Sequence, residues 1–144
     1  MKLAKLDFLL RYPHHLARIM SLRGVSTQKV AEVEQIVDAA PIDSRMMRYR
    51  YGPWDPAYYA LLGALIGRGL VQTLPLAVGS GSGYRTTEKG ARLAAALRSD
   101  ESFAELSDRA DVLRSHLDKS GTTLKDLLYR LPEVADATWK EDLK

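Results

Sequence analysis

The chain of 144 residues is long enough for one domain, and its 46% hydrophobic and 27% charged residues are typical of a folded globular protein. It contains no cysteine, which excludes disulfides, thiolate metal ligands and a cysteine nucleophile. The net charge of +3 is uneven, since residues 1–98 hold 14 Lys/Arg against 7 Asp/Glu and residues 99–144 hold 7 against 11. The basic front part favours an anionic partner, and the acidic rear part a different role.

The first third of the chain predicts helices. Leucines at helical spacing indicate a helix over about residues 2–12, and Pro13 predicts a break before the apolar face continues to a stop at Gly24. Ser26 can cap the next helix, whose valine stripe runs to about residue 40. Residues 42–53 show no sustained period and are expected to form a loop, with strand character at 48–51.

The middle of the chain predicts a helix, a hairpin and another helix. Asp55 as the cap and Pro56 in the first turn indicate a helix that ends at Gly69. Strands are expected over residues 70–78 and 84–86, joined by the Gly-Ser tip at 79–83. Thr87 or Thr86 should cap the following helix, and Gly90 inside it costs about 1 kcal/mol against alanine, which implies a packing reason.

The rear third reads as helical. Apolar residues at three- and four-residue spacing predict a helix over 102–117, which Gly121 ends. Thr123 and Asp126 resemble a capping box for a helix over 124–131, and Pro132 ends it. The expected fold is mainly α with a small β-hairpin: a winged helix-turn-helix domain over 1–98 and a C-terminal helical extension over 99–144, in one compact unit.

Two motifs resemble known families. Gly67-Arg-Gly-Leu-Val71, followed after the hairpin by Tyr84-Arg-Thr-Thr-Glu-Lys-Gly90, resembles the winged-helix pattern, with Arg85 at a normally apolar position. The opening residues 6–13 and the block 48–59, which includes Tyr51-Gly-Pro-Trp-Asp-Pro56, resemble small subunits encoded beside SMC-like ATPases. These subunits are the middle component of ABC-three-component systems and the accessory subunit of Lamassu-type bacterial defence.

The resemblance covers about residues 3–92 and implies a non-catalytic winged-helix accessory subunit in anti-phage or anti-plasmid defence. It would scaffold an SMC-like coiled-coil ATPase and its effector subunit. The alternative is a dimeric winged-helix transcription regulator, in which the amphipathic rear helices would pair with a second copy. A cytoplasmic location is expected, because the chain lacks a long apolar run and its start is unlike a secretory signal.

Basic side chains flank the expected third helix and the wing, where they could hold double-stranded DNA by its phosphates. They are Arg45, Arg48, Arg50, Arg68, Arg85, Lys89 and Arg92. Ordinary solvated charge is the competing interpretation. The third helix itself offers almost no polar side chain to a base edge, so sequence-specific reading is disfavoured and any DNA contact would be non-specific.

Aromatic residues around the third helix are candidates for a protein interface, because aromatic side chains dominate interface hot spots. They are Trp54, Tyr58, Tyr59, Tyr49 and Tyr51. Trp54 could instead pack under the third helix as part of the core. An apolar helix of this kind is either fully buried or covered by a partner, which favours an interaction module.

No residue pattern predicts catalysis. His14 and His15 are adjacent and should diverge on a helix, so they make a poor metal site. The carboxylates of Glu105, Asp108 and Asp111 lie on one acidic helix face with no nucleophile nearby. The Gly-Ser tip lacks the Lys-Ser/Thr of a phosphate loop. We therefore expect neither a cofactor nor a metal, and no enzymatic activity.

Overall fold

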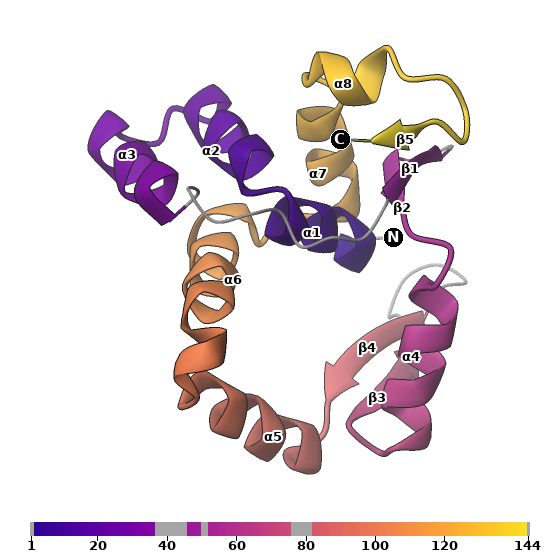
Figure 1. Cartoon of the computed structure of the whole chain (residues 1–144). Coiled ribbons are helices and arrows are strands. Elements are labelled where there is room, and N and C mark those ends of the chain that lie inside the picture. The colour runs from indigo at the N-terminus through magenta and orange to yellow at the C-terminus, as the bar shows by residue number, and fades with distance from the viewer. Residues whose placement is uncertain (1, 37–45, 50–51, 76–81, 144) are drawn as a thin grey trace. The chain divides into compact units, whose positions relative to one another are not determined.

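The computed structural model describes residues 2–36, 46–49, 52–75 and 82–143 (Figure 1). Helices dominate these residues, with short antiparallel strands between them. The chain forms two compact units, one from Met1–Pro56 together with Glu105–Lys144 and the other from Ala57–Ala104. This division differs from the expected one at residue 98, because the rear helices pack with the first helices.

The larger unit contains most of the helices. Its elements are α1 (Lys2–Arg11), α2 (Pro13–Leu22), α3 (Thr27–Ile36), β1 (Met46–Tyr49), β2 (Gly52–Trp54), α6 (Ala104–Leu117), α7 (Gly121–Leu128), α8 (Pro132–Ala135) and β5 (Asp142–Leu143). Pro13 separates α1 from α2, as predicted, because proline is tolerated in the first turn of a helix but not in its interior. Gly24, at φ +71°, follows α2 as expected.

The core of this unit joins both ends of the sequence. Phe8, Leu9 and Leu16 from the first two helices share one buried cluster with Leu124 and Leu128 of α7. The apolar face of α7 is thus covered within the chain, and this helix completes the N-terminal core. It follows that α7 does not offer that face for pairing with a second copy.

A three-stranded antiparallel sheet in the order β2-β1-β5 lies in the larger unit. Met47 pairs with Trp54 across the β1–β2 hairpin, and Met46 pairs with Leu143 at the other edge. The sequence pattern predicted only some strand character near residue 48. It missed β2 and β5, since strands of three and two residues leave no periodic signal.

The smaller unit consists of α4 (Tyr58–Gly67), β3 (Val71–Pro75), β4 (Ser82–Thr86), α5 (Glu88–Arg98) and a 3-10 turn, η1 (Glu101–Phe103). The predicted hairpin is confirmed, with Val71 opposite Thr86 and Pro75 opposite Ser82. Gly69, at φ +67°, turns the chain from α4 into β3. Most of the predicted tip lies outside the described residues.

Three predicted helix ends were wrong. Asp55 does not cap α4, which begins at Tyr58 with Ala57 at the cap position, because the Asp55 carboxylate pairs with Arg11 instead. Ser120 caps α7 by accepting a hydrogen bond from the Thr123 amide, so the helix starts at Gly121 rather than after it. Pro132 begins the short α8 rather than only ending a helix. Among the described residues, no helix combines the length and apolarity that crossing a bilayer requires.

Candidate protein-interaction surface

Helix α4 has no polar side chain apart from two tyrosines. Six of its ten residues are large and apolar or aromatic, and the other four are alanine or glycine. At 100° per residue the large side chains cover a continuous arc centred near Leu62, with Leu61 and Leu65 on one side and Ile66 and Tyr59 on the other. A helix of this composition needs cover on more than one side.

The unit leaves most of this arc in solvent. Only Leu62 is buried in α4, whereas Leu61 is 50% exposed, Leu65 and Ile66 are 39% and 37% exposed, and Tyr59 is 70% exposed. The sequence left two possibilities for this apolar helix, full burial or cover by a partner. Leu61, Leu65 and Ile66 are not buried, because in the described residues of this unit α4 packs mainly against β3, which is too narrow to cover the arc.

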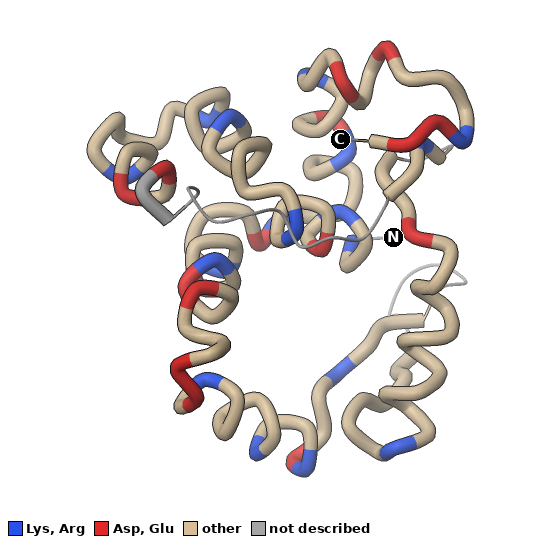
Figure 2. Tube along the Cα trace, viewed as in Figure 1, with Lys and Arg blue, Asp and Glu red and all other residues tan. Residues whose placement is uncertain are grey.

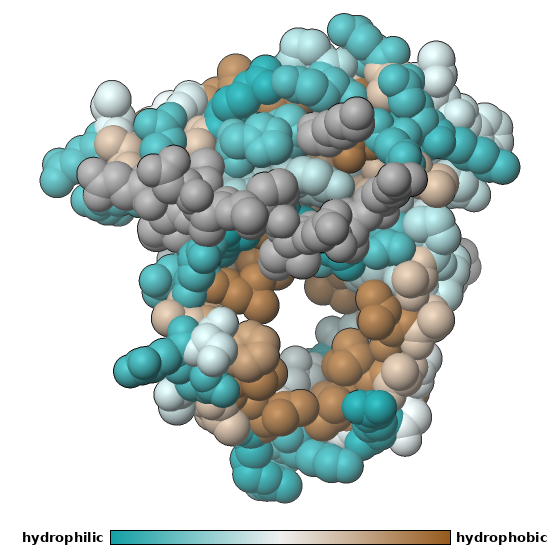
Figure 3. Space-filling view, viewed as in Figure 1, coloured by the Kyte–Doolittle hydropathy of each residue, from teal (hydrophilic) through white to brown (hydrophobic). Residues whose placement is uncertain are grey.

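Helix α5 exposes a second set of leucines. Leu93 and Leu97 lie one turn apart and are 45% and 39% exposed. We call Leu61 and Leu65 of α4, together with Leu93 and Leu97 of α5, the leucine pairs. Figure 3 shows apolar surface gathered along α4 and α5. The smaller unit therefore carries two helices that each present an i,i+4 leucine pair to solvent.

The junction between α4 and α5 is built from backbone contacts. Thr87 caps α5 by accepting a hydrogen bond from the Gly90 amide, as predicted, and its hydroxyl donates to the carbonyl of Gly69 at 2.6 Å. The Lys89 ammonium donates to the carbonyl of Arg68 at 2.8 Å, where a cation suits the C-terminal end of α4. A Cβ on Gly90 would lie 2.1 Å from the carbonyl oxygen of Leu70, which supplies the packing reason for this glycine.

The predicted interface aromatics are divided between the units. Trp54 is only 9% exposed, and its ring lies tilted beside that of Tyr49 in the larger unit, with ring centroids 6.1 Å apart. Tyr58 is half-buried and Tyr59 exposed in α4, while Tyr51 lies outside the described residues. Trp139, which the sequence did not single out, is 67% exposed and meets Tyr49 edge-on. Among the predicted aromatics that the structure describes, Tyr59 is the most exposed.

The predicted DNA-contacting residues also fall in different places. Arg45 and Arg50 lie outside the described residues. Arg48 is used within the larger unit, where its Nε donates to the Val134 carbonyl at 2.8 Å and its guanidinium lies 4.7 Å from the centroid of the Tyr129 ring. The remaining four are exposed in the smaller unit: Arg68, Arg85, Lys89 and Arg92.

A buried ionic group holds the end of β2 against α1. Arg11 pairs with Asp7 at 2.9 Å and with Asp55 at 2.7 Å, and all three side chains are largely buried. Burial raises the pKa of Asp7 above its usual value, although the Arg11 guanidinium opposes this shift. The Asp55 carboxylate and then Asp7 outweigh burial at Arg11 and raise its pKa. This group is structural, since a cation stands between both carboxylates.

The adjacent histidines converge instead of diverging. The Nε2 atoms of His14 and His15 lie 3.1 Å apart, and the His15 ring is buried and stacked on Phe8. Burial lowers the pKa of His14. Within the part of the chain that the structure describes, no three His, Asp or Glu side chains come together as a metal site.

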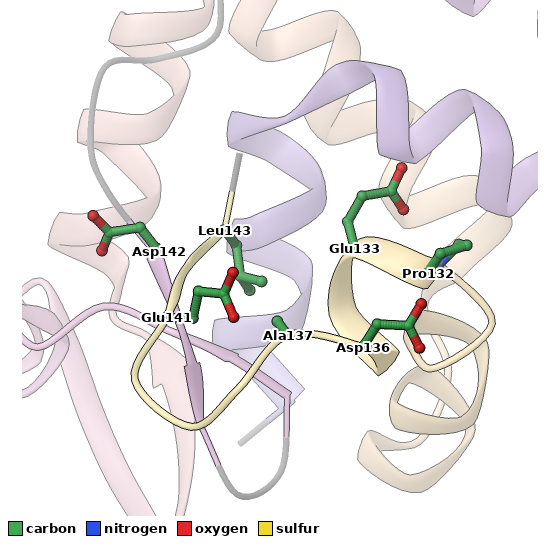
Figure 4. Close-up of a pocket in the computed structure, with 7 residues that line it drawn as sticks. All are labelled: Pro132, Glu133, Asp136, Ala137, Glu141, Asp142 and Leu143. Atoms are coloured by element: carbon green, nitrogen blue, oxygen red, sulfur yellow. The ribbon is translucent and has the colours of Figure 1, made fainter.

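An open depression of about 500 Å³ between α8 and β5 is lined by carboxylates (Figure 4). Glu141 accepts hydrogen bonds from the amide and hydroxyl of Thr138, and Glu133 pairs with Arg18. A backbone amide hydrogen bond is the main cause that lowers the pKa of each of these two glutamates. Glu141 thus holds the loop before β5, and Glu133 ties α8 to α2.

Comparison of the chain with protein-family models, with curated proteins and with solved structures found no significant match. The exposed apolar side chains of the smaller unit are therefore the main functional indication that the described residues provide.

Proposed function

We propose that the protein is a non-catalytic winged-helix accessory subunit of an SMC-like ATPase complex in bacterial anti-phage or anti-plasmid defence. It binds the coiled-coil ATPase through the leucine pairs and leaves the chemistry to its partner. The observation that carries the proposal is the exposure of nearly the whole large-residue arc of α4. Full burial of one leucine side chain is worth about 1.5–3 kcal/mol, and monomeric proteins rarely leave extended apolar patches exposed.

The element order of the smaller unit supports the winged-helix part of the proposal. A helix leads through Gly69 into a hairpin, and the return strand ends on Thr87, which caps the next helix. In this interpretation α4 takes the place of the recognition helix and β3–β4 that of the wing. The identity of the partner rests on the resemblance carried by residues 6–13 and 48–59.

The character of α4 favours a protein partner over an operator sequence. A recognition helix that reads bases needs Arg, Asn, Gln or similar side chains, and α4 has none of them. A regulator that dimerises through its rear helices is also disfavoured, because the apolar face of α7 is buried in the core of its own chain. For these two reasons we keep the transcription regulator as the second candidate.

A pull-down from the source organism tests the proposal. Tagged wild-type protein should recover a large coiled-coil ATPase, identified by mass spectrometry. The double variant Leu61→Gln, Leu65→Gln should lose it, since glutamine keeps helix propensity but removes the apolar contact. Leu22→Gln on α2, where the leucine is 47% exposed, is the matched control and should retain the ATPase.

Two results would contradict the proposal. One is recovery of the bait alone from wild-type cells. The other is equal recovery of the ATPase by the double variant and by Leu22→Gln, which would separate the leucine pair from binding.

A further inference from the structure

Basic side chains lie near one end of each leucine pair. The smaller unit, residues 57–104, holds five Lys/Arg and three acids, Glu88, Asp100 and Glu101, of which the last two follow the far end of α5. Figure 2 shows these cations on the end of α4, on β4 and along α5. Glu88 forms an exposed ion pair with Arg92 at 2.8 Å. The apolar surface of this unit therefore has positive charge at the end of α4 and the start of α5, and the acidic side chains Asp100 and Glu101 beyond the end of α5.

The helical spacing places a cation at one end of each leucine pair. Leu61, Leu65 and Arg68 follow at i, i+4 and i+7 on α4, and Lys89, Leu93 and Leu97 follow at i, i+4 and i+8 on α5. The two basic ends meet, because the Lys89 ammonium bonds to the Arg68 carbonyl. Two rows of leucines thus lead away from one shared basic corner, which we call the Arg68–Lys89 corner.

We propose that this surface binds an amphipathic helix whose leucine-type stripe is flanked by acidic residues. The inference rests on the proposed function and adds the chemistry of the partner segment. Each leucine pair spans about 6 Å, or about one turn of helix, so a partner helix of two to three heptads is more than long enough to cover it. Carboxylates beside the stripe would meet Arg68, Lys89 and Arg92, which gives orientation and faster association as well as affinity.

Other occupants fit the surface less well. A second copy packed with its Arg68–Lys89 corner on a two-fold axis would bring like charges together, which is costly at an interface. A DNA duplex would satisfy the cations but leave both leucine pairs in water. An acidic amphipathic helix is the occupant that complements both the apolar rows and the charge.

Binding of designed peptides to the full chain tests this inference by fluorescence anisotropy. Two labelled 21-residue helical peptides carry the same leucine stripe and differ only in flanking residues, glutamate in one and lysine in the other. The glutamate peptide should bind about tenfold more tightly or better, with an advantage that shrinks as salt is added. Arg68→Gln should weaken its binding about two- to fivefold, and Arg114→Gln, at an exposed arginine of α6, should not.

A charge-reversed variant guards against loss by misfolding. Arg68→Glu combined with Lys89→Glu should reverse the preference and favour the lysine peptide, which an unfolded protein would not do. Equal binding of both peptides would overturn the inference. Tighter binding of a 30-base-pair DNA duplex, with an affinity that Leu61→Gln does not change, would also overturn it. A homodimer that is detected by sedimentation and that Leu61→Gln dissociates would overturn it too.

Failure of this inference and failure of the proposed function are distinguishable. If the coiled-coil ATPase is recovered from cells but the glutamate peptide is not preferred, only the acidic-helix inference falls. If the glutamate peptide is preferred but no ATPase is recovered, the surface stands and the ATPase assignment falls.

Discussion

Gly90 is a residue at which helix propensity and packing oppose each other. It lies in the first turn of α5, where alanine would be the better helix former, yet its α-carbon faces the backbone of the β3 entry. A methyl group there would lie 2.1 Å from the Leu70 carbonyl oxygen and 2.9 Å from a Thr86 methyl. The sequence alone showed that this glycine needed a reason, and the structure provides it.

Gly90→Ala should therefore destabilise the smaller unit by about 1–3 kcal/mol, the usual cost of overpacking. Gly63→Ala in α4 is the matched control, because a Cβ there has no neighbour within 4 Å, and it should stabilise by up to about 1 kcal/mol. Denaturant titration monitored by circular dichroism measures both. A stabilising effect of Gly90→Ala would refute the close backbone approach.

Whether other predictions about single residues were right depended on the sequence separation between the residue and its contact partner. Thr87 was one of two candidate caps, with Thr86, and the candidates could be narrowed to these two because the partner of a cap is only three residues away. Asp55 was misassigned as a cap because its partner, Arg11, is 44 residues away and leaves no trace in the local pattern. The convergence of His14 and His15 was missed for a similar reason, since Phe8 orients the buried His15 ring.

At the scale of elements, the Arg11 group is the contact that fixes the end of β2 to α1. Its members are mostly hidden from water, so each carboxylate depends on the guanidinium for compensation. The exposed Arg92–Glu88 pair has almost the same distance but little burial. A comparison of these two ion pairs therefore shows how burial, at nearly equal distance, changes their contribution to the free energy of unfolding.

Arg11→Leu should cost about 3–5 kcal/mol of unfolding free energy at neutral pH, because it leaves Asp7 and Asp55 buried without a cation. Arg92→Leu should cost about 0.5 kcal/mol or less. The deficit of Arg11→Leu relative to wild type should shrink as pH falls toward about 4, since protonation removes the uncompensated charge. Urea titrations at both pH values test this; equal costs for the two variants would contradict it.

Element predictions succeeded where a periodic pattern was long or a proline marked its end. The pair α1 and α2, the β3–β4 hairpin and α5 were all expected near their observed positions. The β2-β1-β5 sheet was not, since its last strand is two residues long and pairs with a segment almost a hundred residues earlier. Non-local pairing of short strands is decided by the tertiary structure rather than by local propensity.

At the scale of the whole molecule, the two units differ in how much they bury. The larger unit has a continuous cluster of buried apolar residues from its first and last helices. Among the described residues of the smaller unit, Leu62 is the one apolar residue whose side chain is buried. Local stability follows buried apolar contact, so the smaller unit should be the easier one to open.

Hydrogen exchange followed by mass spectrometry should show this difference. Amides of α4, β3, β4 and α5 should exchange faster than those of α1, α2 and α7 in the isolated protein. Binding of the partner should slow exchange in α4 and α5 most, because it supplies the missing cover. Uniform protection across both units in the isolated protein would contradict this account.

The chain leaves the larger unit beside Asp55 and returns to it at Glu105. Arg11 holds Asp55, and Arg109, one turn after Glu105, donates to the Leu10 carbonyl at 3.2 Å, so both crossings are tied to consecutive residues of α1. Residues 57–104 are thus inserted between two segments of the larger unit that both contact α1. Doubling the length of a loop costs only about 0.6 kcal/mol of closure entropy. We therefore expect that a change in the length of this inserted segment would alter the stability of the larger unit only slightly.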